Sequence, residues 1–429
     1  MTKLHMTSSL STPAIAPRAE SDPGSPDDSQ RMNSAEIRSS ASLASIFALR
    51  MLGLFLILPV FSVYAKGLPG GQSATLVGLA MGIYGLAQSF GQIPFGAASD
   101  KYGRKKIIII GLILFAIGSF IAAAAPNIYW IIIGRAVQGA GAISAAITAF
   151  IADSTREEHR TKAMAMVGGS IGLTFALSMV ASPLLYEWVG MGGIFAITGI
   201  LSLAAIAMII FGVPDAPLIK VKQVSWSEIL RNGELMRLNV GVFSLHLTQM
   251  AMFVVMPSAL VQYADLPVTQ HWKIYLPVVL ISFALMLPPV FVGEKQGKMK
   301  QVFVAAIAML LAVQIGMWLA FSQATVHWPL LVGLLLAFFI AFNVLEASQP
   351  SLVSRIAPPG AKGAALGVYN TLQALGLFCG GAIGGLLKQH FGTPSVFILG
   401  GISTLCWLII ASGMINLPRR GKPATAVTH

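Results

Sequence analysis

The residues most able to do chemistry in this chain stand together in one short stretch between two long apolar segments. Positions 96–106 read GAASDKYGRKK. A carboxylate such as Asp100 can oppose the positive end of a helix dipole, and a guanidinium such as Arg104 can bind a second carboxylate. Because so many charges cannot lie in lipid, we expect the stretch to mark a membrane surface, and its four Lys and Arg indicate the cytoplasmic side.

The composition predicts a protein that crosses a membrane several times. Of 429 residues, 55% are hydrophobic and 10% are charged, against roughly 25% charged in soluble domains. The net charge of +12 does not indicate a nucleic-acid partner, because the cations lie in short loops between apolar segments. Cys379 and Cys406 stand alone in apolar runs, so neither a disulfide framework nor a metal site is expected.

Twelve apolar runs of about 20 residues can be laid out along the chain, which is the length that crosses a bilayer. Only helices satisfy their own backbone in lipid at this hydrophobicity, so the sequence predicts an all-α membrane protein with twelve transmembrane helices. The first six are expected at 43–65, 74–98, 106–125, 128–151, 163–187 and 193–213. The second six are expected at 238–263, 272–292, 301–322, 329–352, 363–389 and 395–416.

A long polar stretch after the sixth run divides the chain into two pseudo-symmetric six-helix bundles. The first 40 residues are rich in Ser, Pro and Asp, which is typical of disorder. The expected parts are a disordered cytoplasmic tail over 1–40, bundles over 41–213 and 238–417, a cytoplasmic linker over 214–237 and a cytoplasmic tail over 418–429.

The distribution of cations predicts the orientation in the membrane. With both termini in the cytoplasm, the Lys and Arg outside the spans fall on the cytoplasmic side except Lys66, Lys273 and Lys388, as the positive-inside rule requires. We expect an integral, multi-pass protein of a bacterial cytoplasmic (inner) membrane.

The two halves repeat each other weakly, which is how parallel repeats appear in transporters. The run Phe55–Pro59 matches Phe253–Pro257, and the charged stretch 96–106 has a partly eroded copy at 290–300, where Glu294 takes the place of Asp100. The matches keep their order and nearly constant spacing, so they indicate a duplication.

Three motifs carry a resemblance to the major facilitator superfamily over residues 43–416. They are GxxxDxxGRKK at 96–106, RxxQGxGA at 135–142 and the Leu58-Pro59 step that ends the first span. Within that superfamily the chain resembles drug–proton antiporters, and it looks like the YajR group of efflux proteins. The antiporter motif of the fifth span departs from the pattern, because serines and Pro183 stand where a Gly-Pro pair is expected.

The resemblance implies a gating role for the charged stretch. Asp100 and Arg104 would form a relay with Asp153, at the inner end of the fourth span, and this relay would hold the two halves together when the cavity faces outward. The motif also includes Gly96, Gly103 and Lys105, and its glycines would allow close backbone approach. The alternative is a turn that only fixes topology.

One carboxylate, Glu346, lies well inside a span and is our leading candidate for proton coupling. Burial favours its neutral form, so it could exchange a proton near neutral pH. The alternative is a structural carboxylate that pairs with Arg50 or is capped by Asn343 and Gln349. His246 can also titrate in this range, although a lone histidine in a helix is more often a satisfied core residue.

Two arginines lie within spans. Arg135 is expected to face a cavity or a partner, since an unpaired guanidinium is costly there, and the resemblance implies coupling or bracing of the first span. A structural hydrogen-bonding role is the alternative. Arg50 could contribute to coupling or could extend its charge to the cytoplasmic surface.

Polar and aromatic residues on the spans are candidates for the substrate cavity, and small residues are candidates for hinges or helix packing. The cavity candidates are Phe55, Tyr84, Gln138, Gln249, Met252 and Asn343. The hinge and packing candidates are Gly168, Gly172, Pro183, Gly376 and Gly380.

The sequence therefore favours a secondary active transporter that exports small amphipathic compounds in exchange for protons by alternating access. Its expected partners are a small-molecule substrate, protons and the lipid bilayer, and a monomer is expected. One alternative is an importer or facilitator of a polar metabolite, and another is a non-transporting receptor on the same scaffold. No phosphate loop or zinc motif is present, so neither an enzyme nor a cofactor or metal is expected.

Overall fold

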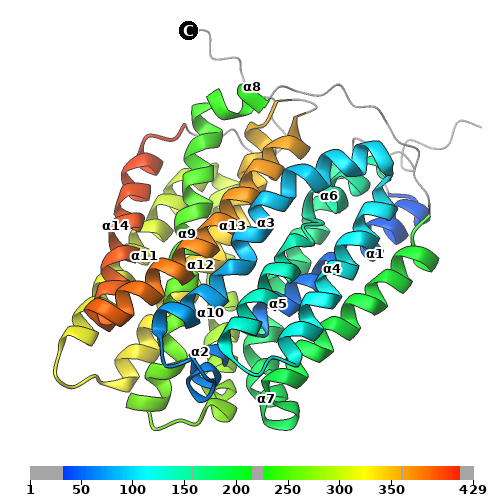
Figure 1. The fold of residues 1–429 in the computed structure, drawn as a ribbon. Helices are drawn as coiled ribbons and strands as arrows, with labels where there is room; N and C mark the ends of the chain where they lie inside the picture. The colour runs from blue at the N-terminus through cyan, green and yellow to red at the C-terminus, as the bar shows by residue number, and fades with distance from the viewer. Residues whose placement is uncertain (1–31, 157–158, 215–225, 359–360, 416–429) are drawn as a thin grey trace, which may run out of the picture.

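A computed structural model describes residues 32–156, 159–214, 226–358 and 361–415. These residues form helices and loops without strands, arranged as two bundles that meet along α3 and α13 (Figure 1). The first bundle contains α1 (Ser34–Phe55), α2 (Phe61–Tyr64), η2 (Ala65–Gly67), α3 (Ala74–Tyr102), α4 (Arg104–Ala123), α5 (Ile128–Ala140), α6 (Ser144–Asp153) and α7 (Arg160–Gly212). The second contains α8 (Trp226–Arg231), α9 (Gly233–Tyr263), η4 (Val268–Gln270), α10 (Trp272–Gln296), α11 (Met299–Ser322), α12 (Trp328–Ile356), α13 (Lys362–Phe391) and α14 (Thr393–Ser412).

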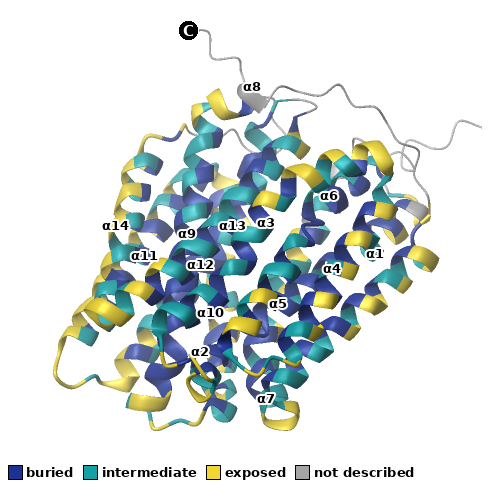
Figure 2. Cartoon of the chain, in the orientation of Figure 1, coloured by how far each residue is buried: buried dark blue, intermediate teal, exposed yellow. Residues whose placement is uncertain are grey.

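Within the described part of the chain, 11 helical segments are long and apolar enough to cross a membrane. The segment Lys162–Gly212 is 51 residues long, and Gly190 interrupts it with a φ of 65°. That left-handed conformation suits glycine and reverses the chain, so this segment supplies the fifth and sixth crossings. Exposed apolar residues cover the outside of the bundles and buried residues fill the inside (Figure 2).

The ends of the bundles differ from the predicted boundaries. Helix α1 already begins at Ser34, where the Asn33 side chain and Glu36 form a capping box, so the predicted disordered tail is wrong for residues 34–40. Within the predicted linker, α8 is helical and α9 begins at Gly233. The rest of the predicted N-terminal tail, linker residues 215–225 and the tail 418–429 lie outside the described residues.

Two spans predicted as continuous helices are broken. In the first span, the α-helix ends at Phe55 and a new helix begins at Phe61, because Pro59 lacks a backbone N–H. The Ser182 hydroxyl donates to the Leu56 carbonyl at 2.5 Å, and this bond stabilises the break. The fourth span breaks after α5 at Gly141, where a Cβ would lie only 2.2 Å from the Gly111 carbonyl oxygen.

Glycines bring the two bundles into close contact. A Cβ on Gly78 of α3 would lie 2.1 Å from the Gly381 carbonyl oxygen of α13, and a Cβ on Gly85 would lie 2.3 Å from that of Ala374. At the end of the bundle opposite the charged loop, Gln389 of α13 accepts a hydrogen bond from the Ser73 hydroxyl at 2.7 Å. The two halves are therefore joined at that end.

The packing glycines fall into two groups. Gly376 and Gly380 of α13 lie against α9, where a Cβ would be 2.4 Å and 2.3 Å from the carbonyl oxygens of Phe243 and Leu247. Gly168 and Gly172 of α7 have nothing within 4 Å of a Cβ. Of the two expected roles, close packing is wrong for Gly168 and Gly172, because no neighbouring atom approaches them, and a hinge remains a prediction. Pro183 lies inside α7 beside Ser182.

We predict opposite effects of alanine at these two kinds of glycine. Gly380→Ala should lower the melting temperature, because the methyl group forces α13 away from α9. Gly168→Ala, the matched control, should leave it unchanged or raise it, since alanine is better than glycine in a helix by about 1 kcal/mol. Thermal unfolding of the purified variants in detergent measures both, and equal shifts would contradict the prediction.

Candidate functional site

The charged loop is a tight turn between α3 and α4. Gly103 has a φ of 100°, a conformation that favours glycine, but nothing lies within 4 Å of where its Cβ would be. At Gly96 a Cβ would make only an ordinary contact with Ala145, at 3.5 Å. The expected close backbone approach at these glycines is therefore wrong, and Gly103 serves the turn itself. Lys105 lies in the first turn of α4.

Arg104 joins three helices of the first bundle. Its Nε donates to Asp153 Oδ2 of α6 at 2.8 Å, and its Nη1 donates to the Ser99 hydroxyl of α3 at 2.7 Å and to Asp100. The Asp153 side chain is 4% exposed and that of Asp100 is 50% exposed. The structure thus brings the predicted relay together, but these contacts lie within the first bundle and do not join the two halves.

The copy of this loop in the second half also forms an ion pair, but the acidic and basic residues have exchanged places. Glu294 of α10 accepts from Arg355 Nη2 at the end of α12, at 2.5 Å. In the first half the loop supplies the arginine and the span end supplies the carboxylate. The repeat therefore preserves an ion pair between loop and span although the charges have exchanged places.

Arg135 is a structural centre of the first bundle. Its guanidinium is 1% exposed and donates to the Ala80 and Met81 carbonyls of α3 at 3.4 and 3.3 Å and to Gln138 at 3.1 Å. It braces the second span rather than the first, so the implied bracing of the first span is wrong. Gln138 in turn donates to Ser119 of α4 at 2.7 Å, so its amide is used within the bundle.

Arg50 is buried but only partly satisfied. It is 2% exposed, so it does not extend its charge to the cytoplasmic surface. Its Nη1 donates to the Ser144 hydroxyl at 2.7 Å, while Nε and Nη2 have no hydrogen-bond partner. The Tyr84 ring lies between two cations, 5.7 Å from the Arg50 Cζ and 4.8 Å from the Arg135 Cζ.

Glu346 pairs with His246 in the second bundle. Glu346 Oε2 lies 3.6 Å from His246 Nε2, which is also 2.8 Å from Gln373 Nε2 of α13. His246 Nδ1 contacts the Val242 carbonyl at 3.0 Å. The two residues expected as alternative partners of Glu346 bind other groups. Arg50 donates to Ser144, and Asn343 donates to Ser282 at 2.9 Å.

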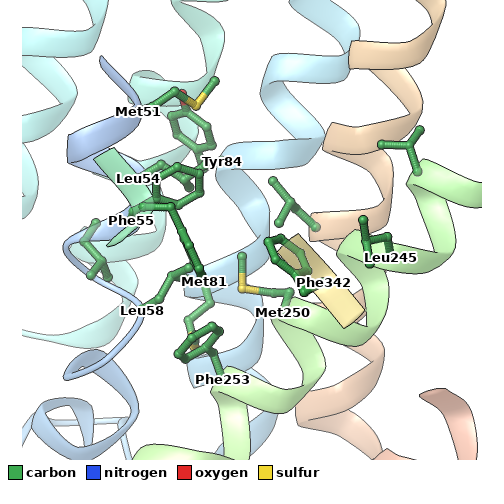
Figure 3. Packing of buried hydrophobic residues seen from close by; sticks show 14 of the residues in the cluster. Met51, Leu54, Phe55, Leu58, Met81, Tyr84, Leu245, Met250, Phe253 and Phe342 are labelled. Atoms are coloured by element: carbon green, nitrogen blue, oxygen red, sulfur yellow. The ribbon is translucent and has the colours of Figure 1, made fainter. Parts of the chain in front are cut away.

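Aromatic side chains connect this pair to the first bundle. Phe175 of α7 contacts Phe55 of α1 at 5.1 Å between ring centroids, and Phe342 of α12 at 5.4 Å. Phe342 contacts the His246 ring at 6.0 Å. Figure 3 shows the side chains of α1 and α3 on one side of this core and those of α9 and α12 on the other.

The remaining cavity candidates are buried on α9 in this structure. Met252 is 1% exposed. Gln249 is 0% exposed, and neither its amide nitrogen nor its oxygen has a hydrogen-bond partner. Among the residues that the structure describes, no three His, Cys, Asp or Glu side chains gather as a metal site would require.

Four residues of this site, Phe175, Phe342, Ser144 and Gln373, are not among the candidates expected from the sequence. The two phenylalanines are among many apolar residues on apolar helices, so no pattern distinguished them. Gln373 carried a usable signal, because an amide on a span calls for a polar partner.

The described helices cross a membrane in two repeated bundles and bury charged residues inside the spans, and together these features define a polytopic membrane transporter. The chain belongs to the Major Facilitator Superfamily, whose family model matches residues 43–381 and 350–428. This confirms the predicted family and the all-α transporter fold, and it assigns the chain to transporters and not to enzymes.

The chain is similar in sequence to two named transport proteins and in fold to a third. It is 43% identical over 394 residues to the inner membrane transport protein YajR of Escherichia coli (strain K12), covering 90% of this chain and 86% of that protein. It is 24% identical over 371 residues to the multidrug resistance protein MdtH of Aeromonas hydrophila subsp. hydrophila, covering 84% and 89%. The fold matches a bacterial homolog of the human lysosomal transporter Spinster, in an inward-facing and occupied conformation, with a TM-score of 0.67 and 13% identity over 89% of this chain and 96% of that chain.

The Arg104 contacts predict unequal roles for its two carboxylates in stability. Asp153→Asn should lower the free energy of unfolding by about 3 kcal/mol, because it removes one partner of a buried ion pair. Asp100→Asn should cost less than about 1 kcal/mol, since that carboxylate is half exposed. Denaturant unfolding in detergent compares the two, and a larger loss for Asp100→Asn would contradict this assignment.

Proposed function

We propose that this chain is a proton-coupled secondary transporter that exports small amphipathic compounds in exchange for protons. The observation that carries the proposal is the contact between Glu346 and His246, near the middle of α12 and α9 and beside the aromatic core that connects the bundles. A titratable pair at that place can link its protonation to the separation of the bundles.

The hydrogen bonds around His246 suggest that the pair needs one shared proton. When Nδ1 carries its hydrogen toward the Val242 carbonyl, the neutral ring has only an acceptor at Nε2. A charged Glu346 beside that lone pair would be repelled. Nε2 instead accepts from the Gln373 amide at 2.8 Å. Glu346 at 3.6 Å is therefore tolerated when it is protonated and neutral, or when the ring is a cation and the Gln373 amide turns its oxygen toward it. Binding or losing a proton therefore changes what holds α9 and α12 together.

The surroundings of the pair support an amphipathic substrate over a polar metabolite. Phe55, Phe175 and Phe342 form the surface between the bundles, and apolar side chains dominate the buried core around them. A polar metabolite would need several hydrogen-bonding groups at this surface. The multidrug resistance protein MdtH among the relatives supports the direction of export.

The charged loop contributes to gating in this proposal. Arg104 ties α3, α4 and α6 into one unit, and α6 packs on α13 of the other bundle. Movement of the second bundle would therefore act on a rigid group of helices. We propose that the loop faces the cytoplasm, together with both termini, in a bacterial inner membrane.

Glu346→Gln should abolish proton movement linked to substrate addition, because glutamine cannot release a proton. The assay uses proteoliposomes with an internal pH dye and a panel of lipophilic cations, neutral aromatics and aromatic anions. Glu187→Gln, which neutralises an exposed carboxylate, is the matched control and should retain the signal. A proton signal that survives Glu346→Gln removes this residue from coupling, and no signal from the parent with the whole panel would favour a receptor.

A further inference from the structure

We infer that the transported compound is an amphipathic organic anion and that Arg50 holds its negative group. This assignment rests on the proposed transport function and gives its substrate class. It begins from the charges buried inside the spans.

The interior of the described spans carries more positive than negative charge. Arg50 and Arg135 are both buried within the first bundle, and neither forms an ion pair in the described part of the chain. Glu346 is the carboxylate inside a described span, and it contacts His246. The other described carboxylates lie at helix ends or in loops, apart from Glu187, which is exposed in α7 just before the break at Gly190. A lipophilic cation would add to an existing excess of positive charge.

The two arginines differ in what their donors do. All three guanidinium nitrogens of Arg135 donate to protein oxygens, so its charge is satisfied by dipoles within the bundle. Arg50 uses one nitrogen on Ser144 and leaves two without partners. Leaving charged donors unpaired inside a membrane protein is costly. A ligand that supplies the missing acceptors during the transport cycle would explain the unpaired donors of Arg50.

The geometry of a guanidinium defines the ligand group. Two N–H groups of one arginine match the two oxygens of a carboxylate in a bidentate pair. The Tyr84 hydroxyl is also buried without a partner and offers a further donor near Arg50. One and a half helical turns along α1, Phe55 begins the aromatic core that would contact the apolar body of the compound.

In the present conformation the unpaired nitrogens are closed off from solvent, and side chains of both bundles fill the core (Figure 3). Alternating access requires that the bundles separate before substrate enters. We expect this separation also to open a path to Arg50, whose recorded contacts, Ser144 and Tyr84, lie in the first bundle and can persist. We therefore expect anion binding to favour a conformation other than the closed core.

Three probes of one shape test the charge preference. They are 2-naphthoxyacetate, the neutral 2-naphthoxyacetamide and 2-(2-naphthoxy)ethyl-trimethylammonium, titrated calorimetrically into the protein in nanodiscs with empty nanodiscs as the blank. The carboxylate should bind about tenfold more tightly than the amide, as expected for hydrogen bonds to a charged group. Tighter binding of the trimethylammonium, equal binding of all three, or no binding would overturn the assignment.

Variants of Arg50 separate binding from folding. Arg50→Gln should remove the preference for the carboxylate and leave the affinity for the amide unchanged, while Arg50→Lys should retain part of the preference. Arg231→Gln, which removes an exposed cation at the end of α8, should behave as the parent.

Arg50→Met should raise the melting temperature because it removes an unsatisfied charge, whereas Arg135→Met should lower it. A fall for Arg50→Met would mean that Arg50 is structural.

The flux assay keeps the two proposals distinguishable. Proton movement elicited by the trimethylammonium alone would preserve the transporter and overturn the anion assignment. Arg50-dependent binding of the carboxylate without proton movement would preserve the anion site and contradict proton coupling.

Discussion

The structure depends on one constraint, which is that a charge or a backbone polar group inside a membrane needs a partner within the protein. Arg135 meets this constraint with two carbonyls of α3 and the Gln138 amide, and it thereby fixes α5 against α3. The Leu56 carbonyl, freed by the break before Phe61, meets it through Ser182. The first bundle is a rigid body because its polar groups bind one another.

The contacts between the bundles have a different character. Helices gain little from hydrophobic burial against each other in lipid, so close approach at small residues and polar bonds must hold them. Gly78 and Gly381 provide that approach, and Gln389 adds a hydrogen bond at the same end. Near the middle, the bundles meet through the rings of Phe175 and Phe342, and Phe342 contacts His246 beside Glu346 within the second bundle. Ring contacts are not directional enough to bind the bundles permanently, which suits halves that must separate.

The buried charged and polar residues divide into those that are hydrogen-bonded in the closed state and those that keep atoms without a partner. Arg104, Asp153 and Arg135 belong to the first group, and they maintain the shape of the first bundle. Arg50, Glu346 and Gln249 retain buried atoms without partners. Unsatisfied polar atoms cost stability, so these are the residues whose partners we expect to change during transport.

The sequence by itself determined the spans, the duplication and the charged turn. These depend on local properties: the length of apolar runs, the repeat of Phe55–Pro59 as Phe253–Pro257, and a density of charge at 96–106 that lipid excludes. Only the tertiary structure decided that Glu346 meets His246 rather than Arg50, that Arg135 braces α3, and that Gly380 is packed tightly while Gly168 is not. Helical periodicity places a residue on a face of its own helix, but which helix lies opposite that face, and how closely, is set by the packing of all the others.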